Sequence, residues 1–400
     1  MGMRELQRTA AACCIISLLV LGDMRAWGAQ AAVEAGELAI THGPYLQAAS
    51  ETGMTIVWAT NRKCVSRVEY GPAPDGPAST ASASHHGLID ANITLHRVSI
   101  TGLEPGRTYY YRAISTEIVD FKAYKVTYGG TIRSADGRFT TLDVRKKQFS
   151  FVVLNDRHEK VKPLRTALDW IDWGTIDLAF LVGDMINDPM TEQQTFKSLI
   201  DSCVSFFAGR IPFILVRGNH ETRGTAARGL MDYFPTDSQR YYHSMSHGGV
   251  RFIMLDGGED KADTSPEYSG LVDFESYLKQ ETEWLRQEIQ SEGFGKANLR
   301  VVMIHVPPTG MEDPKFIREK WVLDQWGPLF DKGKVDLVIS GHTHQFEEIG
   351  PREGKNNYPI LIGDTETVMR VDVSEGRMSI TVSGNDGTVR RGPVRRVKSR

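Results

Sequence analysis

Residues 177–184 read DLAFLVGD, a nearly continuous apolar run that ends in a glycine and an aspartate. A short apolar run of this kind predicts a strand that is buried on both faces, as in a parallel sheet covered by helices. Runs of the same type occur at 151–154, 212–216, 250–255, 301–304, 336–340 and 359–362. The region from 149 onward therefore contains the strands of a buried sheet.

Segments with a helical period lie between several of these runs. In residues 274–289, one helical face collects Phe274, Tyr277, Leu278, Trp284 and Leu285. Strands that alternate with helices predict an α/β domain. The last part, 359–383, is rich in strand-forming residues and predicts a hairpin that completes a sheet.

Five of the buried runs end in residues that can bind a metal. The candidate metal ligands at these five ends are Asp156, His158, Asp184, Asn219, His305, His342 and His344. Ligand sites in open α/β sheets lie beyond the carboxyl ends of the strands, so we expect these side chains to meet. Carboxylate, amide and imidazole ligands without thiolate suit Fe, Mn or Zn. Seven ligands are too many for one catalytic zinc, but they fit two divalent metals that share a carboxylate.

Local spacing supports the same hypothesis. The pairs Asp156/His158 and His342/His344 have i, i+2 spacing, which places both side chains on the same side of an extended segment. A glycine precedes Asp184, Asn219 and His342 and lets the chain approach the metals closely. Arg157 and Arg217 stand next to ligands and are weaker candidates for a phosphate contact, because neighbours on an extended chain point to opposite sides.

The region 38–143 has the texture of an all-β domain. Strands are predicted at 54–60, 66–71, 96–103, 104–115 and 139–142, a loop at 72–92 and a linker at 144–148. Short strands at regular spacing with Gly and Pro turns predict a small sandwich.

The N-terminus has the pattern of a secretory signal, with a basic start, a short apolar stretch and Ala29-Gln30-Ala31 as a cleavage site. We expect residues 1–31 to be removed and the protein to be exported without stable membrane insertion; an uncleaved anchor is the alternative. Cys64 and Cys203 are expected to be unpaired thiols.

Charge excludes one class of function. A net charge of −3 argues against a nucleic-acid partner. The basic residues 384–400 are interpreted as a solvated, disordered tail. The oligomeric state cannot be read from the sequence.

The order D-x-H, G-D-x-x-N-D, G-N-H-E, a lone His after a strand, and G-H-x-H resembles the calcineurin-like metallophosphoesterase superfamily over residues 149–383. GPYLQ (43–47), Trp58 and ITGLEPGRTYYYR (100–112) resemble the fibronectin-III-like N-terminal domain of purple acid phosphatases. The two resemblances imply a four-layer α/β/β/α domain preceded by a small all-β sandwich.

The resemblance also implies roles for individual residues. Asp156, His158 and His344 would bind the first metal, Asn219, His305 and His342 the second, and Asp184 would bridge them. His220 would be the catalytic histidine that protonates the leaving group, and Glu221 would orient it or tune its charge.

One position departs from the purple acid phosphatase pattern. Those enzymes have a tyrosine ligand three residues after the bridging Asp and a glycine two residues after the first Asp, where this chain has Asn187 and His158. The tyrosinate colour is therefore not expected, and neither an Fe(III) site nor a strongly acidic optimum is carried over.

The resulting expectation is a secreted phosphoesterase with two divalent metals, Fe, Mn or Zn, that hydrolyses small phosphate monoesters. A phosphodiesterase acting on nucleotides or lipid head groups is the alternative within the same chemistry. A binding or adhesion protein with a vestigial metal site is the alternative of another class.

Overall fold

The computed structural model describes residues 36–74, 79–310, 317–384, 389–391 and 395–396. The predicted signal peptide and most of the predicted tail lie outside these residues. The described part of the tail is not the disordered segment expected, because residues 389–391 and 395–396 form short strands that pair with residues 377–383. Leu38–Arg400 forms one compact unit, so the domain boundaries expected at 143 and 149 stay predictions. Across the described ranges, no helix has both the length and the apolar character needed to cross a bilayer.

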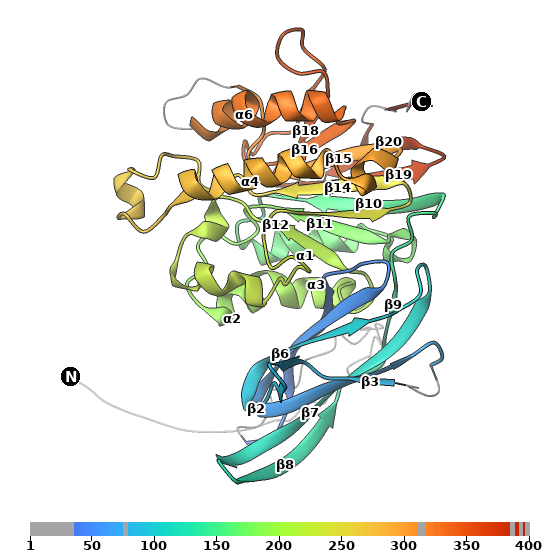
Figure 1. Cartoon of the computed structure of the whole chain (residues 1–400), viewed down its shortest axis with the longest axis vertical. Helices are drawn as coiled ribbons and strands as arrows, with labels where there is room; N and C mark the ends of the chain where they lie inside the picture. The colour runs from blue at the N-terminus through green and yellow to red at the C-terminus, as the bar shows by residue number, and fades with distance from the viewer. Residues whose placement is uncertain (1–35, 75–78, 311–316, 385–388, 392–394, 397–400) are drawn as a thin grey trace, which may run out of the picture. The chain divides into compact units, whose positions relative to one another are not determined.

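An all-β region begins the described chain (Figure 1). Its main strands are β1 (Ile40–Gln47), β2 (Gly53–Gly71), β3 (Ser79–Ala81), β6 (Ile93–Thr101), β7 (Thr108–Lys122), β8 (Lys125–Arg133) and β9 (Gly137–Thr140). The 19-residue β2 pairs with β1 and β6 through its first half and with β3 and β7 through its second. Trp58 is fully buried here, and its indole N–H donates to Ser115 Oγ at 2.9 Å.

This region differs from the prediction in several details, and β1 and β8 were not among the predicted strands. The strands expected at 54–60 and 66–71 are one strand, because the polar residues between them lie where β2 changes partners, at a break in register between Ala59 and Cys64. The segment expected to be a loop contains β3 and the small pair β4 (Ser84–His85) and β5 (Leu88–Ile89). Cys64 and Cys203 are buried free thiols, as expected.

The second region is built on two sheets. The first has the order β12-β11-β10-β19-β20-β21, with β22 also on β20, and the second has the order β13-β14-β15-β16-β18-β17. Their strands are β10 (Gln148–Leu154), β11 (Leu178–Val182), β12 (Phe213–Val216), β13 (His243–His247), β14 (Val250–Leu255), β15 (Leu299–Ile304), β16 (Leu337–Ser340), β17 (Glu347–Ile349), β18 (Ile360–Ile362), β19 (Thr367–Ser374), β20 (Arg377–Gly384), β21 (Val389–Arg391) and β22 (Arg395–Arg396). Every apolar run predicted to be a strand is one, and β19 and β20 form the predicted closing hairpin.

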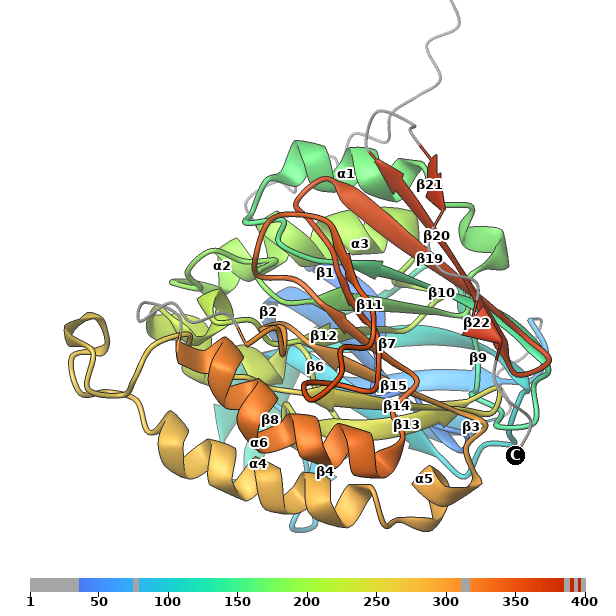
Figure 2. The same cartoon turned by 90° about the horizontal axis from the view of Figure 1, so that it is seen from above.

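Helices cover the outer face of each sheet, as Figure 2 shows. They are α1 (Val161–Asp169), α2 (Glu192–Thr195), α3 (Asp201–Phe206), α4 (Phe274–Glu288), α5 (Glu292–Lys296) and α6 (Ile317–Gly333). One apolar core, with Phe151, Phe180 and Phe252, lies between the sheets. A second packs the first sheet against α1 and α3, and a third packs the other sheet against α4 and α6. The predicted four-layer α/β/β/α fold behind an all-β region is confirmed.

The all-β region is fastened to the α/β region by buried groups. Tyr45 is fully buried in the core that contains α1 and α3, and its hydroxyl donates to the Tyr233 carbonyl at 2.8 Å. Gln47 Nε2 donates to the Phe213 carbonyl at 3.0 Å, and the Tyr111 hydroxyl to the Gly209 carbonyl at 3.0 Å. The two regions therefore share a hydrophobic core.

A buried histidine predicts sensitivity to acid. His96 is 2% exposed, and burial lowers its pKa from 6.5 to about 4. Between pH 6.5 and 4 the unfolded chain binds a proton there that the folded chain does not, so stability falls as the pH falls. The upper limit from this group is about 3 kcal/mol. His247 is buried with the same lowered pKa and adds to the effect.

We expect His96→Gln to flatten this dependence. The free energy of unfolding, measured in urea at pH 7.5, 6.0 and 4.5, should decline less steeply for the variant than for the wild type, even though the variant is less stable at pH 7.5. Parallel declines in the two proteins would contradict a neutral buried His96.

Candidate metal centre

The structure brings all seven predicted ligands together at one edge of the two sheets. Each lies within four residues beyond the end of its strand. They follow β10 (Asp156 and His158), β11 (Asp184), β12 (Asn219), β15 (His305) and β16 (His342 and His344). The site exists because parallel strands of both sheets end here, β10, β11 and β12 in the first sheet and β15 and β16 in the second.

The ligand atoms fall into two groups that share one residue. Asp156, His158, Asp184 and His344 offer atoms that all lie within 4.8 Å of one another, and so do Asp184, His305 and His342. Asn219 joins the second group, since its Oδ1 lies 3.2 Å from His342 Nδ1. The two groups are the ones that the resemblance implied, with Asp184 common to both.

In the first group, hydrogen bonding decides which histidine nitrogen is available. His158 Nδ1 lies 3.0 Å from the Asn187 side-chain oxygen, so it carries the proton. Its other nitrogen, Nε2, lies 2.9 Å from His344 Nε2. Two imidazole nitrogens this close are aimed at a common point, as two ligands of one cation are. Asn187 stands where purple acid phosphatases have a tyrosine ligand, and in this chain it orients His158.

In the second group, a buried nitrogen makes no hydrogen bond. His305 Nδ1 donates to the Val182 carbonyl at 2.9 Å. His305 Nε2 is buried with no hydrogen-bond partner and lies 3.1 Å from Asp184 Oδ2. A buried nitrogen that lies against a carboxylate without a well-formed hydrogen bond requires an explanation. A cation held between imidazole and carboxylate supplies one, so the residues fit a metal.

The backbone at the site is strained. Five of the predicted ligands have a positive φ, between 46° and 76°, namely Asp156, His158, Asp184, His342 and His344. Such conformations disfavour residues with a Cβ and cost on the order of 1 kcal/mol or more each. Strained backbone conformations of this kind persist where the surrounding structure holds them in place, often at functional sites. The strained segments turn sharply off the strands and point the side chains inward.

Two glycines permit the close approach. A Cβ at Gly218 would lie 2.3 Å from Asp184 Oδ1, and a Cβ at Gly341 would lie 2.3 Å from Asp156 Oδ2. Any larger residue would displace a predicted ligand carboxylate. The expectation from the sequence is that these glycines let the chain approach the metal site closely, and the short distances to the ligand carboxylates agree with that role.

Charges in the metal-free chain balance one another. Burial acts to lower the pKa of His305, but the Asp184 and Asp156 carboxylates raise it to about 10. Burial lowers the pKa of His342 to about 4, so this imidazole is neutral. A cation would take the place of the His305 proton, since a ligand histidine must be deprotonated.

His220 stands beside the metal ligands. Its backbone N–H donates to Asp184 Oδ1 at 3.0 Å, and its Nδ1 donates to the Asn187 carbonyl at 2.8 Å. The remaining nitrogen, Nε2, lies 3.9 Å from Asp184 Oδ2. The half-buried ring therefore presents Nε2 to the space beside the ligands.

Glu221 has a different position from the one expected. Its carboxylate is fully buried and accepts backbone N–H groups from Asp184 at 2.8 Å, Ile186 at 2.8 Å and Gly218 at 2.9 Å. The hydrogen bonds found for it do not include the His220 ring. Glu221 therefore holds the loops after β11 and β12 together, and does not orient His220.

The two candidate phosphate-binding arginines also point elsewhere. Arg157 is buried and donates to the carbonyls of Thr365 and Thr367. Arg217 forms an ion pair with Asp256 and packs against the Tyr241 ring. The partners found for both side chains are therefore residues other than the seven predicted ligands, although the segment around Arg157 is not the extended chain assumed from the sequence, because Asp156 and His158 have positive φ.

Three residues near the ligands were missed by sequence reasoning. Arg223 Nη1 lies 3.2 Å from His220 Nε2. Glu319, on α6, lies 3.8 Å from His342 Nε2. Asn187 was noted only as a departure from a pattern. Arg223 follows the short helical turn His220–Thr222 directly and stands three residues after His220, and that spacing was the available signal.

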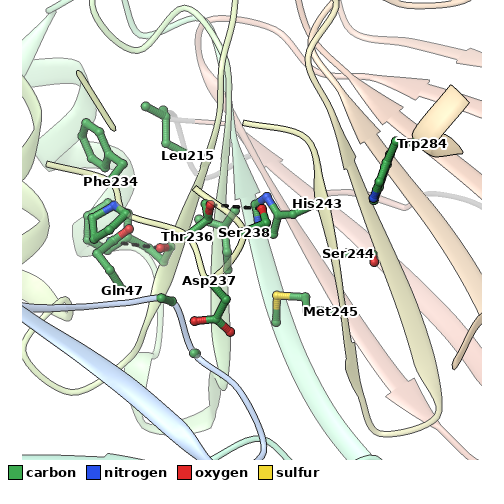
Figure 3. Close-up of a pocket in the computed structure, with 15 residues that line it drawn as sticks. Gln47, Leu215, Phe234, Thr236, Asp237, Ser238, His243, Ser244, Met245 and Trp284 are labelled. Atoms are coloured by element: carbon green, nitrogen blue, oxygen red, sulfur yellow. Dashed lines mark hydrogen bonds between the residues drawn. The ribbon is translucent and has the colours of Figure 1, made fainter. Parts of the chain in front are cut away.

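A separate cavity lies away from this centre (Figure 3). It has a volume of about 180 Å³ and lies between β12, β13 and the turn after β1. Its lining includes Gln47, Asp237, His243 and Trp284 but none of the seven predicted ligands. The metal chemistry therefore belongs to the strand ends and not to this cavity.

Comparison with known families agrees with the ligand geometry. Residues 149–346 match the calcineurin-like phosphoesterase family. The chain contains a calcineurin-like phosphoesterase domain. Residues 42–141 match the purple acid phosphatase N-terminal domain, so this phosphoesterase has the two-part organisation predicted from its sequence.

Relatives of this calcineurin-like phosphoesterase are purple acid phosphatases. It is 25% identical to purple acid phosphatase 18 of Arabidopsis thaliana, over 76% of this chain and 65% of that protein. It is 23% identical to human acid phosphatase type 7, over 88% of this chain and 78% of that protein. The chain thus spans about two thirds of the length of such plant relatives.

A solved structure shows the same fold. Purple acid phosphatase PPD1 from yellow lupin seeds superposes with a TM-score of 0.61 at 15% identity, covering 87% of this chain and 73% of that one. This similarity establishes the architecture of the phosphoesterase.

Proposed function

We propose that the protein is an exported phosphoesterase that hydrolyses small phosphate monoesters with two divalent metals. The observation that carries the proposal is the pair of carboxylate–histidine groups that share Asp184. A shared carboxylate is the arrangement of two-metal hydrolytic sites. Export rests on the N-terminal sequence alone.

The chain's own residues hold and orient the reactants. Asp156, His158 and His344 would hold one cation, Asn219, His305 and His342 the other, and Asp184 both. The cations would supply Lewis acidity and lower the pKa of water. Fe, Mn and Zn all suit this ligand set.

His220 is the proposed proton donor. Because its Nδ1 is committed to the Asn187 carbonyl, its Nε2 is the atom that can donate to a leaving oxygen. Asn187 thus contacts both histidines, His158 through its side chain and His220 through its backbone. Glu221 acts on this site only through the loops that it holds.

The monoester class is supported by the relatives, which are named as phosphatases. A phosphodiesterase that acts on nucleotides or lipid head groups uses the same ligands and remains the alternative. A binding protein with a vestigial metal site is disfavoured because the ligand set is complete and His220 is in place.

Metal removal is the decisive test. We expect EDTA to reduce hydrolysis of p-nitrophenyl phosphate by at least about 10³-fold, because the metals supply most of the charge stabilisation. Mn²⁺ or Fe²⁺ should restore it. Activity that is unchanged in metal-free protein would disprove the proposal. Hydrolysis of bis(p-nitrophenyl) phosphate alone would favour the diesterase.

A further inference from the structure

The strongest unexplained group near the centre is the Arg223 guanidinium. Its Nε and Nη2 donate to the two oxygens of Glu259, at 3.1 and 3.2 Å. Glu259 is almost fully buried and is fixed by two further hydroxyl donors, Thr222 at 2.7 Å and Tyr268 at 3.0 Å. One edge of the guanidinium is therefore clamped in a single orientation.

The two hydrogen bonds to Glu259 leave the third guanidinium nitrogen of Arg223, Nη1, beside the metal ligands. Arg223 Nη1 lies 3.3 Å from His220 Nδ1 and 3.2 Å from His220 Nε2. An atom nearly equidistant from both ring nitrogens lies over the ring face, since a position in the ring plane would clash with the carbon between them. His220 Nδ1 is already committed to the Asn187 carbonyl. One Nη1 hydrogen is thus directed at the His220 ring, and the second can bind another acceptor beside it.

The charge and exposure of Arg223 suit an anion. Its side chain is 28% exposed, whereas that of Glu259 is 1% exposed. Burial acts to lower the Arg223 pKa, but the Glu259, Asp260 and Asp184 carboxylates raise it, so the group stays charged. Arginine forms strong charge-assisted hydrogen bonds to phosphate oxygens. A clamped arginine loses less entropy on making them.

On the basis of the proposed function, we infer that Arg223 binds a non-bridging oxygen of the substrate phosphate and favours monoesters over diesters. A monoester has three non-bridging oxygens and a diester has two. A further donor beside the metal ligands therefore has an oxygen to bind in the monoester that the diester lacks. Glu259 is the positioning residue that aims Arg223.

The test compares Arg223→Ala with a matched control, Arg251→Ala. Arg251 makes the same kind of two-point pair with Glu288, at 2.8 and 3.1 Å, on β14 and away from the ligands. On metal-loaded protein, Arg223→Ala should lower kcat/KM for p-nitrophenyl phosphate by about 30- to 100-fold, the effect of one charged hydrogen bond. The loss for bis(p-nitrophenyl) phosphate should be under about 10-fold. Arg251→Ala should change neither.

A second readout separates binding from structure. Calorimetric titration with inorganic phosphate should show at least about tenfold weaker binding to Arg223→Ala, with metal content close to wild type. The Tm should fall, because the buried Glu259 loses its ion-pair partner. Arg223→Lys should recover part of the affinity, and Glu259→Gln should lose part of it. Equal losses on monoester and diester, or unchanged phosphate affinity, would overturn the inference. A wild type that hydrolyses nothing would refute the proposed function, while the phosphate titration would still test Arg223.

Discussion

Replacing Asp184 by asparagine should abolish hydrolysis and release both metals. Asp184 is 1% exposed, belongs to both ligand groups, and accepts the His220 backbone N–H at 3.0 Å. An amide removes the negative charge and one of the two oxygen ligands. We expect activity to fall by about 10³-fold or more, with less than one metal bound per chain.

The split of the ligands makes this prediction specific. His342→Ala should lose mainly the metal of the second group, because His342 contacts Asn219 and does not belong to the first group. Metal content by elemental analysis should therefore rank wild type, His342→Ala and Asp184→Asn in descending order. Asp372→Asn, on β19, is the control and should keep both metals. An Asp184→Asn protein that retains two metals, or a His342→Ala protein that loses both equally, would contradict the assignment.

Replacing Glu221 by glutamine should destabilise the fold by about 3 kcal/mol. Both Glu221 oxygens accept backbone N–H groups, three in all. Glutamine keeps one oxygen and places an N–H₂ group against buried donors, and each unsatisfied buried group costs about 1–3 kcal/mol. Because one of the donors belongs to Asp184, metal affinity should fall as well.

Glu281 offers a matched control. It is equally buried, but it accepts one backbone N–H, from Asp256 at 2.8 Å, and its other oxygen has no partner. Burial, followed by the Asp256 charge, raises the Glu281 pKa well above its ordinary value and favours the neutral carboxyl, which resembles an amide, whereas burial and the Asp184 charge raise the Glu221 pKa to about 7. Urea unfolding of Glu281→Gln should show a loss under about 1 kcal/mol. Comparable losses in the two variants would refute the role given to Glu221.

The sequence predicted the strands and the ligand set for a physical reason. A strand buried on both faces must be apolar throughout, so a polar residue at its end marks where the sheet edge begins. Five such strand ends in the sequence indicated the positions of Asp156, Asp184, Asn219, His305 and His342. The helical period of residues 274–289 predicted α4 equally well, and Phe274, Leu278 and Leu285 are buried on its inner face.

The rest depended on contacts that no pattern encodes. Glu221 and His220 are adjacent in sequence, yet they serve different partners because a short helical turn sends their side chains apart. Arg223 acquires its orientation from Glu259, 36 residues away. Arg157 and Arg217 were weaker candidates for a phosphate contact, and their partners, the Thr365 and Thr367 carbonyls and Asp256, could not be read from the sequence.

The burial of Tyr45 in the core of the α/β region bears on how the molecule gains stability. The boundary between the two family matches lies near residues 141–149. It does not separate units of cooperative unfolding, because releasing the all-β region would expose the Tyr233 and Phe213 carbonyls and part of a hydrophobic core. The leading module thus serves the phosphoesterase as a structural component of its own core.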